Sequence, residues 1–110
     1  AQAIRVVADG QPVGWVGVWD RDASSAEVGW SVLIEAQGRG IAARAAQLLL
    51  DFARTLERWS WSHAYPSVDN APSNAICRKL GFELVDARDY EWPPGSGERM
   101  RCNDWRISVA

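Results

Sequence analysis

The sequence predicts an α/β domain with a mixed, mostly antiparallel sheet that contains one parallel pair of strands. Three strand patterns follow one another within residues 3–34, joined by short polar turns, which favours antiparallel pairing. A glycine-rich loop then opens an amphipathic helix, and a further strand pattern follows at residues 59–65. A strand–helix–strand connection of this kind brings its two strands together in parallel. We expect residues 1–110 to form a single domain.

The first half of the chain reads as a meander. Asp9-Gly10 separates a β-branched run at residues 3–8 from a return strand at 13–19, and Asp-Gly is a strong hairpin signal. A polar turn precedes the third strand, expected from about Ala26 to Ile34. The following helix, from Ile41 to about Glu57, shows apolar residues at spacings of three and four. This apolar stripe consists of Ile41, Ala45, Leu48, Leu49, Phe52 and Leu56.

The second half predicts a short helix and two more strands. Asn70 is suited to cap this helix, Pro72 to occupy its first turn and Gly81 to end it. Residues 82–92 and 100–109 then read as the last two strands, separated by a Pro/Gly-rich loop.

Composition excludes several classes of protein. The net charge is −2 and the sequence contains no basic run, so a nucleic-acid partner is not expected. Unbroken apolar runs such as Leu48–Leu50 are too short for a membrane span. Cys77 and Cys102 lie in a helix and a strand pattern without metal-binding spacing, which favours reduced thiols in a cytoplasmic protein and no metal site.

The loop before the long helix is the strongest functional signal. Its sequence is Gln37-Gly38-Arg39-Gly40-Ile41-Ala42. Two glycines let the backbone approach a ligand closely, and the N-terminus of a helix adds partial positive charge. The loop therefore predicts a site for a phosphorylated ligand.

Two motifs together resemble those of the GNAT acyltransferases. The loop matches the Q/R-x-x-G-x-G/A pattern with which that family binds acetyl-coenzyme A. The segment from Asn70 to Phe82, which ends Lys79-Leu80-Gly81-Phe82, is similar to the second family motif, an Asn, a short helix and Lys-x-Gly-Phe. The resemblance covers nearly the whole chain, but the strand and two helices that usually precede this hairpin are missing. We expect a domain shortened at its N-terminus.

The resemblance implies a cofactor site for acetyl-coenzyme A. The amides of residues 38–42 would hold the diphosphate, and the backbone of residues 32–34 would pair with the pantetheine arm. Polar residues of the second motif would lie on the other side of that arm, and Arg78 or Lys79 could reach phosphate. The full expected set is Val32, Leu33, Ile34, Gln37, Gly38, Arg39, Gly40, Ile41, Ala42, Asn70, Ser73, Asn74 and Lys79.

The implied reaction is acetyl transfer to a primary amine, which must lose a proton before it attacks the thioester. Glu27, on the strand before the loop, is the candidate base, and His63 and Asp69 are the other titratable options. Glu27 and His63 also have a structural interpretation, as a solvent-facing strand residue and as a structural histidine within a strand. Many relatives place a Tyr acid where this chain has Cys77; we expect Cys77 to be a buried thiol and no residue of this helix to be an essential acid.

Other readings stay open at this stage. The segment from Gly38 to Ala43 also fits a dinucleotide-binding fingerprint, although Glu35-Ala36-Gln37 separates it from the strand and only one strand–helix–strand unit exists. The chain could instead be an incomplete acyl-coenzyme A-binding module. The acceptor is not identified: it could be a peptide or a small-molecule amine. An exposed sheet edge would favour a homodimer.

Overall fold

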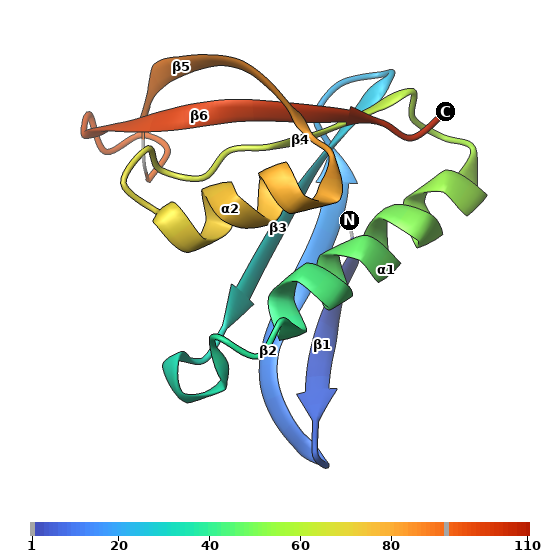
Figure 1. Cartoon of the computed structure of the whole chain (residues 1–110). Helices are drawn as coiled ribbons and strands as arrows, with labels where there is room; N and C mark the ends of the chain where they lie inside the picture. The colour runs from blue at the N-terminus through green and yellow to red at the C-terminus, as the bar shows by residue number, and fades with distance from the viewer. Residues whose placement is uncertain (1, 92) are drawn as a thin grey trace.

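The computed structural model describes residues 2–91 and 93–110, so Trp92, the expected end of one strand, lies outside the described residues. The described residues form six strands and two α-helices (Figure 1). The strands are β1 (Gln2–Ala8), β2 (Gln11–Asp20), β3 (Ser25–Val32), β4 (Trp61–Ala64), β5 (Glu83–Glu91) and β6 (Arg99–Ser108). The helices are α1 (Ile41–Leu56) and α2 (Ala71–Leu80), with a short 3-10 turn η1 (Ile34–Ala36) after β3.

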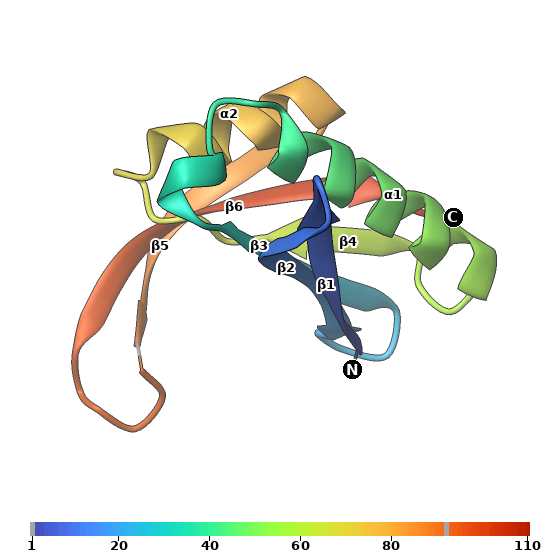
Figure 2. The ribbon, with the colours of Figure 1, turned by 90° about the horizontal axis from the view of Figure 1, so that it is seen from below.

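The sheet has the order β1-β2-β3-β4-β6-β5. β3 and β4 are parallel, and the other neighbouring strands are antiparallel. Both α-helices lie on the same side of the sheet, as Figure 2 shows. The mixed, mostly antiparallel sheet with one parallel pair is therefore confirmed, and the hairpin at Asp9-Gly10 takes the positive φ angles expected of its turn.

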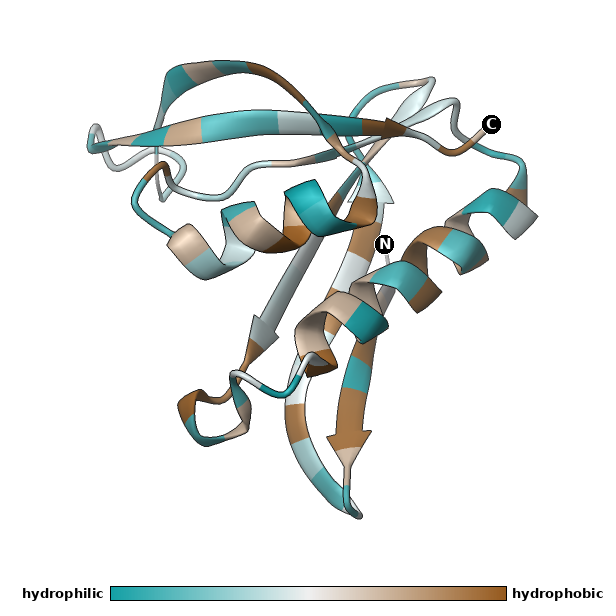
Figure 3. Ribbon diagram, in the orientation of Figure 1, coloured by the Kyte–Doolittle hydropathy of each residue, from teal (hydrophilic) through white to brown (hydrophobic). Residues whose placement is uncertain are grey.

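Helix α1 packs on the sheet through alanines and two leucines, and the predicted stripe was wrong at Leu48 and Leu56. The buried residues of α1 are Ala43, Ala46, Leu49, Leu50 and Ala53. Leu48 is 59% exposed and Leu56 44% exposed. Alanines let the helix approach β2 and β3 closely, with Leu49 and Leu50 buried in the contact and Leu48 and Leu56 outside it. Figure 3 shows the apolar bands that recur along α1.

Strand β3 is shorter at its end than the sequence indicated. It stops at Val32, although the Leu33 N–H still donates to the Val13 carbonyl at 2.7 Å. Ile34 then starts the 3-10 turn and is 83% exposed, whereas Ala36 is buried and anchors the turn. The chain thereby reverses direction before it enters the glycine loop.

Candidate active site

Strands β3 and β4 pair over only three residues and then separate. Their register runs from Ser25 opposite Trp61 to Glu27 opposite His63. Beyond this point the chain after β4 pairs with β6, where Asn103 donates its N–H to the Pro66 carbonyl at 2.9 Å. The second half of β3 therefore faces a gap in the sheet, with α2 on the opposite side of the gap.

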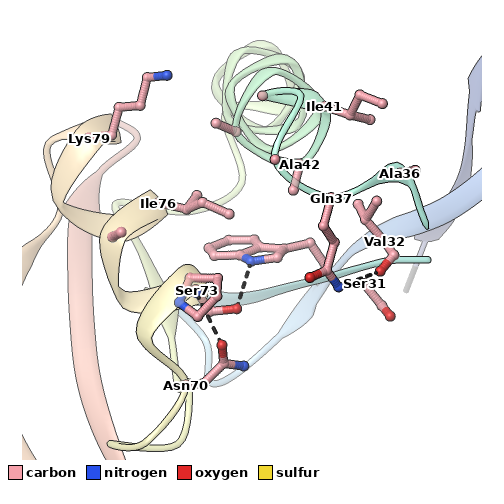
Figure 4. A pocket seen from close by; sticks show the side chains of 16 residues that line it. Ser31, Val32, Ala36, Gln37, Ile41, Ala42, Asn70, Ser73, Ile76 and Lys79 are labelled. Carbon is pink, nitrogen blue, oxygen red and sulfur yellow. Dashed lines mark hydrogen bonds between the residues drawn. The ribbon is translucent and has the colours of Figure 1, made fainter. Parts of the chain in front are cut away.

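A cavity of about 500 Å³ occupies this region between β3, the glycine loop and α2 (Figure 4). This is a typical size for a small-molecule or cofactor site. Nine residues of the expected cofactor set line it. They are Val32, Gln37, Gly38, Gly40, Ile41, Ala42, Asn70, Ser73 and Lys79.

The glycine loop leaves the N-terminus of α1 open toward the cavity. Gly38 and Gly40 adopt φ angles of +80° and +74°, and a Cβ on either would meet nothing within 4 Å. Glycine is thus required by the backbone conformation rather than by lack of space. No side chain caps α1 and its first turn has no acidic residue. Its first N–H groups are therefore suited to an anion.

Four residues of the expected set do not line the cavity: Leu33, Ile34, Arg39 and Asn74. The Arg39 guanidinium forms an ion pair with Asp9 at 2.7 Å, which ties the loop to the β1–β2 turn. Arg78 also lies outside the lining, with its guanidinium 5.5 Å from the Trp105 ring centre. Lys79 is therefore the cationic side chain at the cavity wall among the described residues.

The amide of Asn74 is used to position α2. Its nitrogen donates to the carbonyls of Ser67 and Asn70, at 3.0 and 2.9 Å. Its oxygen accepts from Asn103 and from the Trp105 indole, at 2.9 and 2.8 Å. Both donors and the acceptor oxygen are satisfied, so this buried side chain fixes α2 against β6.

Sequence reasoning missed Trp30, Ser31, Pro72 and Ile76, which also line the cavity. The Trp30 indole donates to the Ser73 hydroxyl at 3.3 Å and so connects β3 to α2 across the gap. The alternation of β3 places Trp30 with Val28 and Val32, which favours packing and gives no indication of a cavity wall. The signal that was available is its position two residues before the end of the strand that leads into the loop.

Glu27 and His63 lie on the other face of the sheet, where β3 and β4 begin to separate. Burial raises the pKa of Glu27, and a hydrogen bond with Trp19 and the charges of Arg21 and His63 oppose this shift only in part. His63 Nδ1 lies 2.7 Å from Asp104 Oδ1 in a buried contact. The structure thus brings together two of the three titratable candidates. Asp69 lies apart, exposed on the connection that precedes α2.

Cys77 is completely buried in α2, and burial raises the pKa of its thiol to about 12. Both cysteines are free thiols. In the described part of the chain, His, Cys, Asp and Glu side chains form no group that could hold a metal ion. Neither α-helix within residues 2–91 and 93–110 has the length and apolar character needed to span a membrane.

Comparison with known proteins identifies the fold and the family. A family model described as "Acetyltransferase (GNAT) domain" matches residues 2–83. A ribosomal-protein-alanine N-acetyltransferase from Brucella melitensis superposes with a TM-score of 0.79 at 22% identity, over 94% of this chain and 66% of that one. A Salmonella typhimurium protein solved with its cofactor acetyl-CoA gives a TM-score of 0.80 at 18% identity, over 94% and 62%.

A ribosomal L7/L12 alpha-N-protein acetyltransferase in complex with coenzyme A is also similar. Its TM-score is 0.76 at 20% identity, over 90% of this chain and 56% of that one. The chain thus spans less than two thirds of the length of these solved structures. The match to the family covers most of the chain and includes β3, the glycine loop, α1 and α2. The chain therefore belongs to the GNAT acetyltransferase family.

Proposed function

We propose that this chain binds acetyl-coenzyme A and transfers the acetyl group to a primary amine. The observation that carries the proposal is the open N-terminus of α1, whose glycine loop faces a cavity of about 500 Å³ at the gap in the sheet. Two of the similar structures contain acetyl-CoA or coenzyme A. A dinucleotide-binding fold is disfavoured, because the described residues contain one parallel strand pair and such folds need several.

The cofactor would follow the cavity from the loop to the gap. The amides of residues 38–42 would hold the diphosphate, with the ammonium group of Lys79 as a nearby counter-charge. The pantetheine arm would pass between β3 and α2, with Asn70 and Ser73 on the α2 side. We limit pairing with β3 to the backbone near Val32, because Leu33 and Ile34 lie outside the cavity. The thioester would then reach the point where β3 and β4 separate.

Glu27 would act as the general base for the amine. Because burial raises its pKa, this carboxylate is a better proton acceptor than an exposed glutamate. The face around it also offers apolar surface: a Cβ at Gly29 would lie 3.1 and 3.5 Å from the rings of Trp19 and Trp15. An amine carried by a peptide or a small molecule would approach over these rings. The structure favours none of these acceptors.

β1 and β5 are the outer strands of the described sheet, and we propose that an edge strand pairs with a second copy in a homodimer. Two buried free thiols support a cytoplasmic location.

The test is a pair of measurements on the purified protein. Calorimetric titration with acetyl-coenzyme A, with NADH as a control, should show binding of the thioester alone. Release of coenzyme A thiol should then depend on an added amine, in a panel of peptides, polyamines and amino acids. Absence of binding to acetyl-coenzyme A would contradict the proposal. Binding with only slow hydrolysis across the panel would favour a binding module without transferase activity.

A further inference from the structure

Three titratable side chains, those of Glu27, His63 and Asp104, lie in a row on neighbouring strands where β3 and β4 separate. The proposed function uses only Glu27. Glu27 on β3 is the register partner of His63 on β4. The His63 ring contacts Asp104 on β6 at 2.7 Å. The side chains of His63 and Asp104 are 10% and 4% exposed, so the pair is nearly dry. Burying a charged carboxylate can cost free energy, even when it forms a hydrogen bond. A buried acid–imidazole pair therefore indicates a function beyond packing.

The contact with Asp104 fixes which ring nitrogen of His63 carries the proton. A carboxylate can only accept, so Nδ1–H donates and Nε2 of the neutral ring keeps its lone pair. Tyr65 stacks on the ring, with centroids 5.8 Å apart and planes 13° apart, which holds the ring in place. The imidazole is thus oriented, carries one open basic nitrogen and lies beside Glu27.

We propose that His63, positioned by Asp104, receives from Glu27 the proton that the acceptor amine releases. This inference rests on the proposed function and adds the path by which the base is regenerated. His63 acts through Glu27 and is a positioning and relay residue. Its charged and titratable neighbours come from each element around it. They are Glu27 on β3, Arg21 in the β2–β3 turn, Asp104 and Arg106 on β6, and Tyr65 after β4.

The proton balance is complete without a further reagent. The ammonium group gives one proton to the Glu27 carboxylate, and the free amine attacks the thioester carbonyl. The C–N bond forms and the C–S bond breaks. The departing thiolate takes up the second proton that the nitrogen loses. The Glu27 proton moves through a bridging water to His63 Nε2 and then to bulk solvent, so each turnover releases one proton and one coenzyme A thiol.

The main test combines three variants in the acceptor-dependent assay. His63→Gln keeps a polar side chain of similar size without a titrating ring, and should lower kcat by about 10–100-fold with little change in acetyl-coenzyme A affinity. Asp104→Asn should also lower kcat, but less, because an amide side chain can also donate a hydrogen bond and no longer fixes Nδ1 as the protonated nitrogen of His63. Asp86→Asn is the matched control: Asp86 faces Asp104 from β5 and forms its ion pair with Arg88. It should keep the wild-type kcat.

His63 is the single histidine of the chain, which permits a direct test in the wild-type protein. Long-range nitrogen–proton NMR should show the Nδ1–H form of the neutral ring. In Glu27→Gln the Nδ1–H form should persist, because Asp104 rather than Glu27 holds that proton. The opposite tautomer in the wild-type protein would overturn the relay even if His63→Gln did not fold.

The outcomes separate the relay from the proposed function. Acetyl transfer by wild type, with unchanged kcat and pH profile in a folded His63→Gln, would overturn the relay and leave the transferase intact. A protein that binds acetyl-coenzyme A but acetylates no amine would overturn both.

Discussion

The two faces of the sheet build their parts of the candidate site in different ways. On the helix-covered face, the cavity depends on backbone: two glycines at positive φ and the uncapped start of α1. On the opposite face, the acid–base group depends on side chains from three strands, β3, β4 and β6. The glycine loop and the start of α1 are thus local in sequence, whereas Asp104 lies 41 positions from His63. Substitutions should therefore separate cofactor affinity from turnover.

The largest effect is expected for Glu27→Gln. The amide cannot accept a proton, so kcat should fall by about 10²–10⁴-fold. The affinity for coenzyme A should not change, because Glu27 lies on the face opposite the cavity and does not line it. Glu35→Gln, an exposed change in η1 next to the loop, is the matched control and should keep wild-type kcat. Steady-state kinetics and calorimetry test this. Weakened coenzyme A binding in a folded Glu27→Gln would contradict the assignment of cofactor affinity and turnover to different faces of the sheet.

Gly40→Val should instead weaken the affinity for coenzyme A. At a φ of +74° a β-branched residue is strained by about 1–2 kcal/mol, so the loop should relax and its N–H groups should move away from the cavity. The Kd for coenzyme A should rise by about 10-fold. Calorimetric titration is the measurement.

The control for Gly40→Val is Gly97→Val in the β5–β6 loop. Gly97 has a φ of +76° and open space around its Cβ position, so it carries the same strain away from the cavity. Its variant should lose a similar amount of stability and keep the wild-type Kd. An equal loss of affinity in both variants would mean that the glycine loop acts through stability alone.

The pH dependence of stability gives a smaller effect, on the acid–base face. Because burial raises the pKa of Glu27 above 4.5, the folded state binds its proton more tightly than the unfolded state. This carboxyl therefore costs stability as pH rises from about 4.5 through the folded value. Glu27→Gln removes the cost, so it should be more stable than wild type at pH 7, within about 1 kcal/mol, and equally stable below pH 4.5. Thermal unfolding at several pH values measures this; a variant that is less stable at pH 7 would contradict the sign.

The fold could be read from the sequence wherever the signals were local. The Asp9-Gly10 turn, the Asn70 cap and Gly81 each fixed an element with a few neighbouring residues, and the structure has all three. The buried face of α1 could be read only in part: Leu49 was placed correctly, whereas the exposure of Leu48 and the burial of Leu50 depend on how closely the helix approaches the sheet. Asp104 was missed for the same reason: its contact with His63 requires the order of β4 and β6.

The residues expected to bind the cofactor show the same difference between local signals and long-range contacts. The loop and Asn70 are contiguous motifs, and the structure places them around one cavity. Asn74 lies in the same motif, yet its amide nitrogen is committed to the nearby Ser67 carbonyl and its oxygen to Asn103 and Trp105 on the distant strand β6. Motif position alone does not distinguish a side chain that faces the cavity from one that holds α2 in place.

Cys77→Ala should have the smallest effect on turnover. The thiol lies where relatives carry a tyrosine acid, but burial raises its pKa to about 12 and it is 0% exposed, so it cannot exchange protons with a leaving thiolate at neutral pH. The variant should keep the wild-type kcat and coenzyme A affinity and lose about 1 kcal/mol of stability through the small cavity left by the sulfur. Denaturant unfolding and steady-state kinetics on the same preparation check both. Lost turnover in a folded variant with intact cofactor affinity would place an essential acid on α2. The proposed acid–base chemistry would then involve both faces of the sheet.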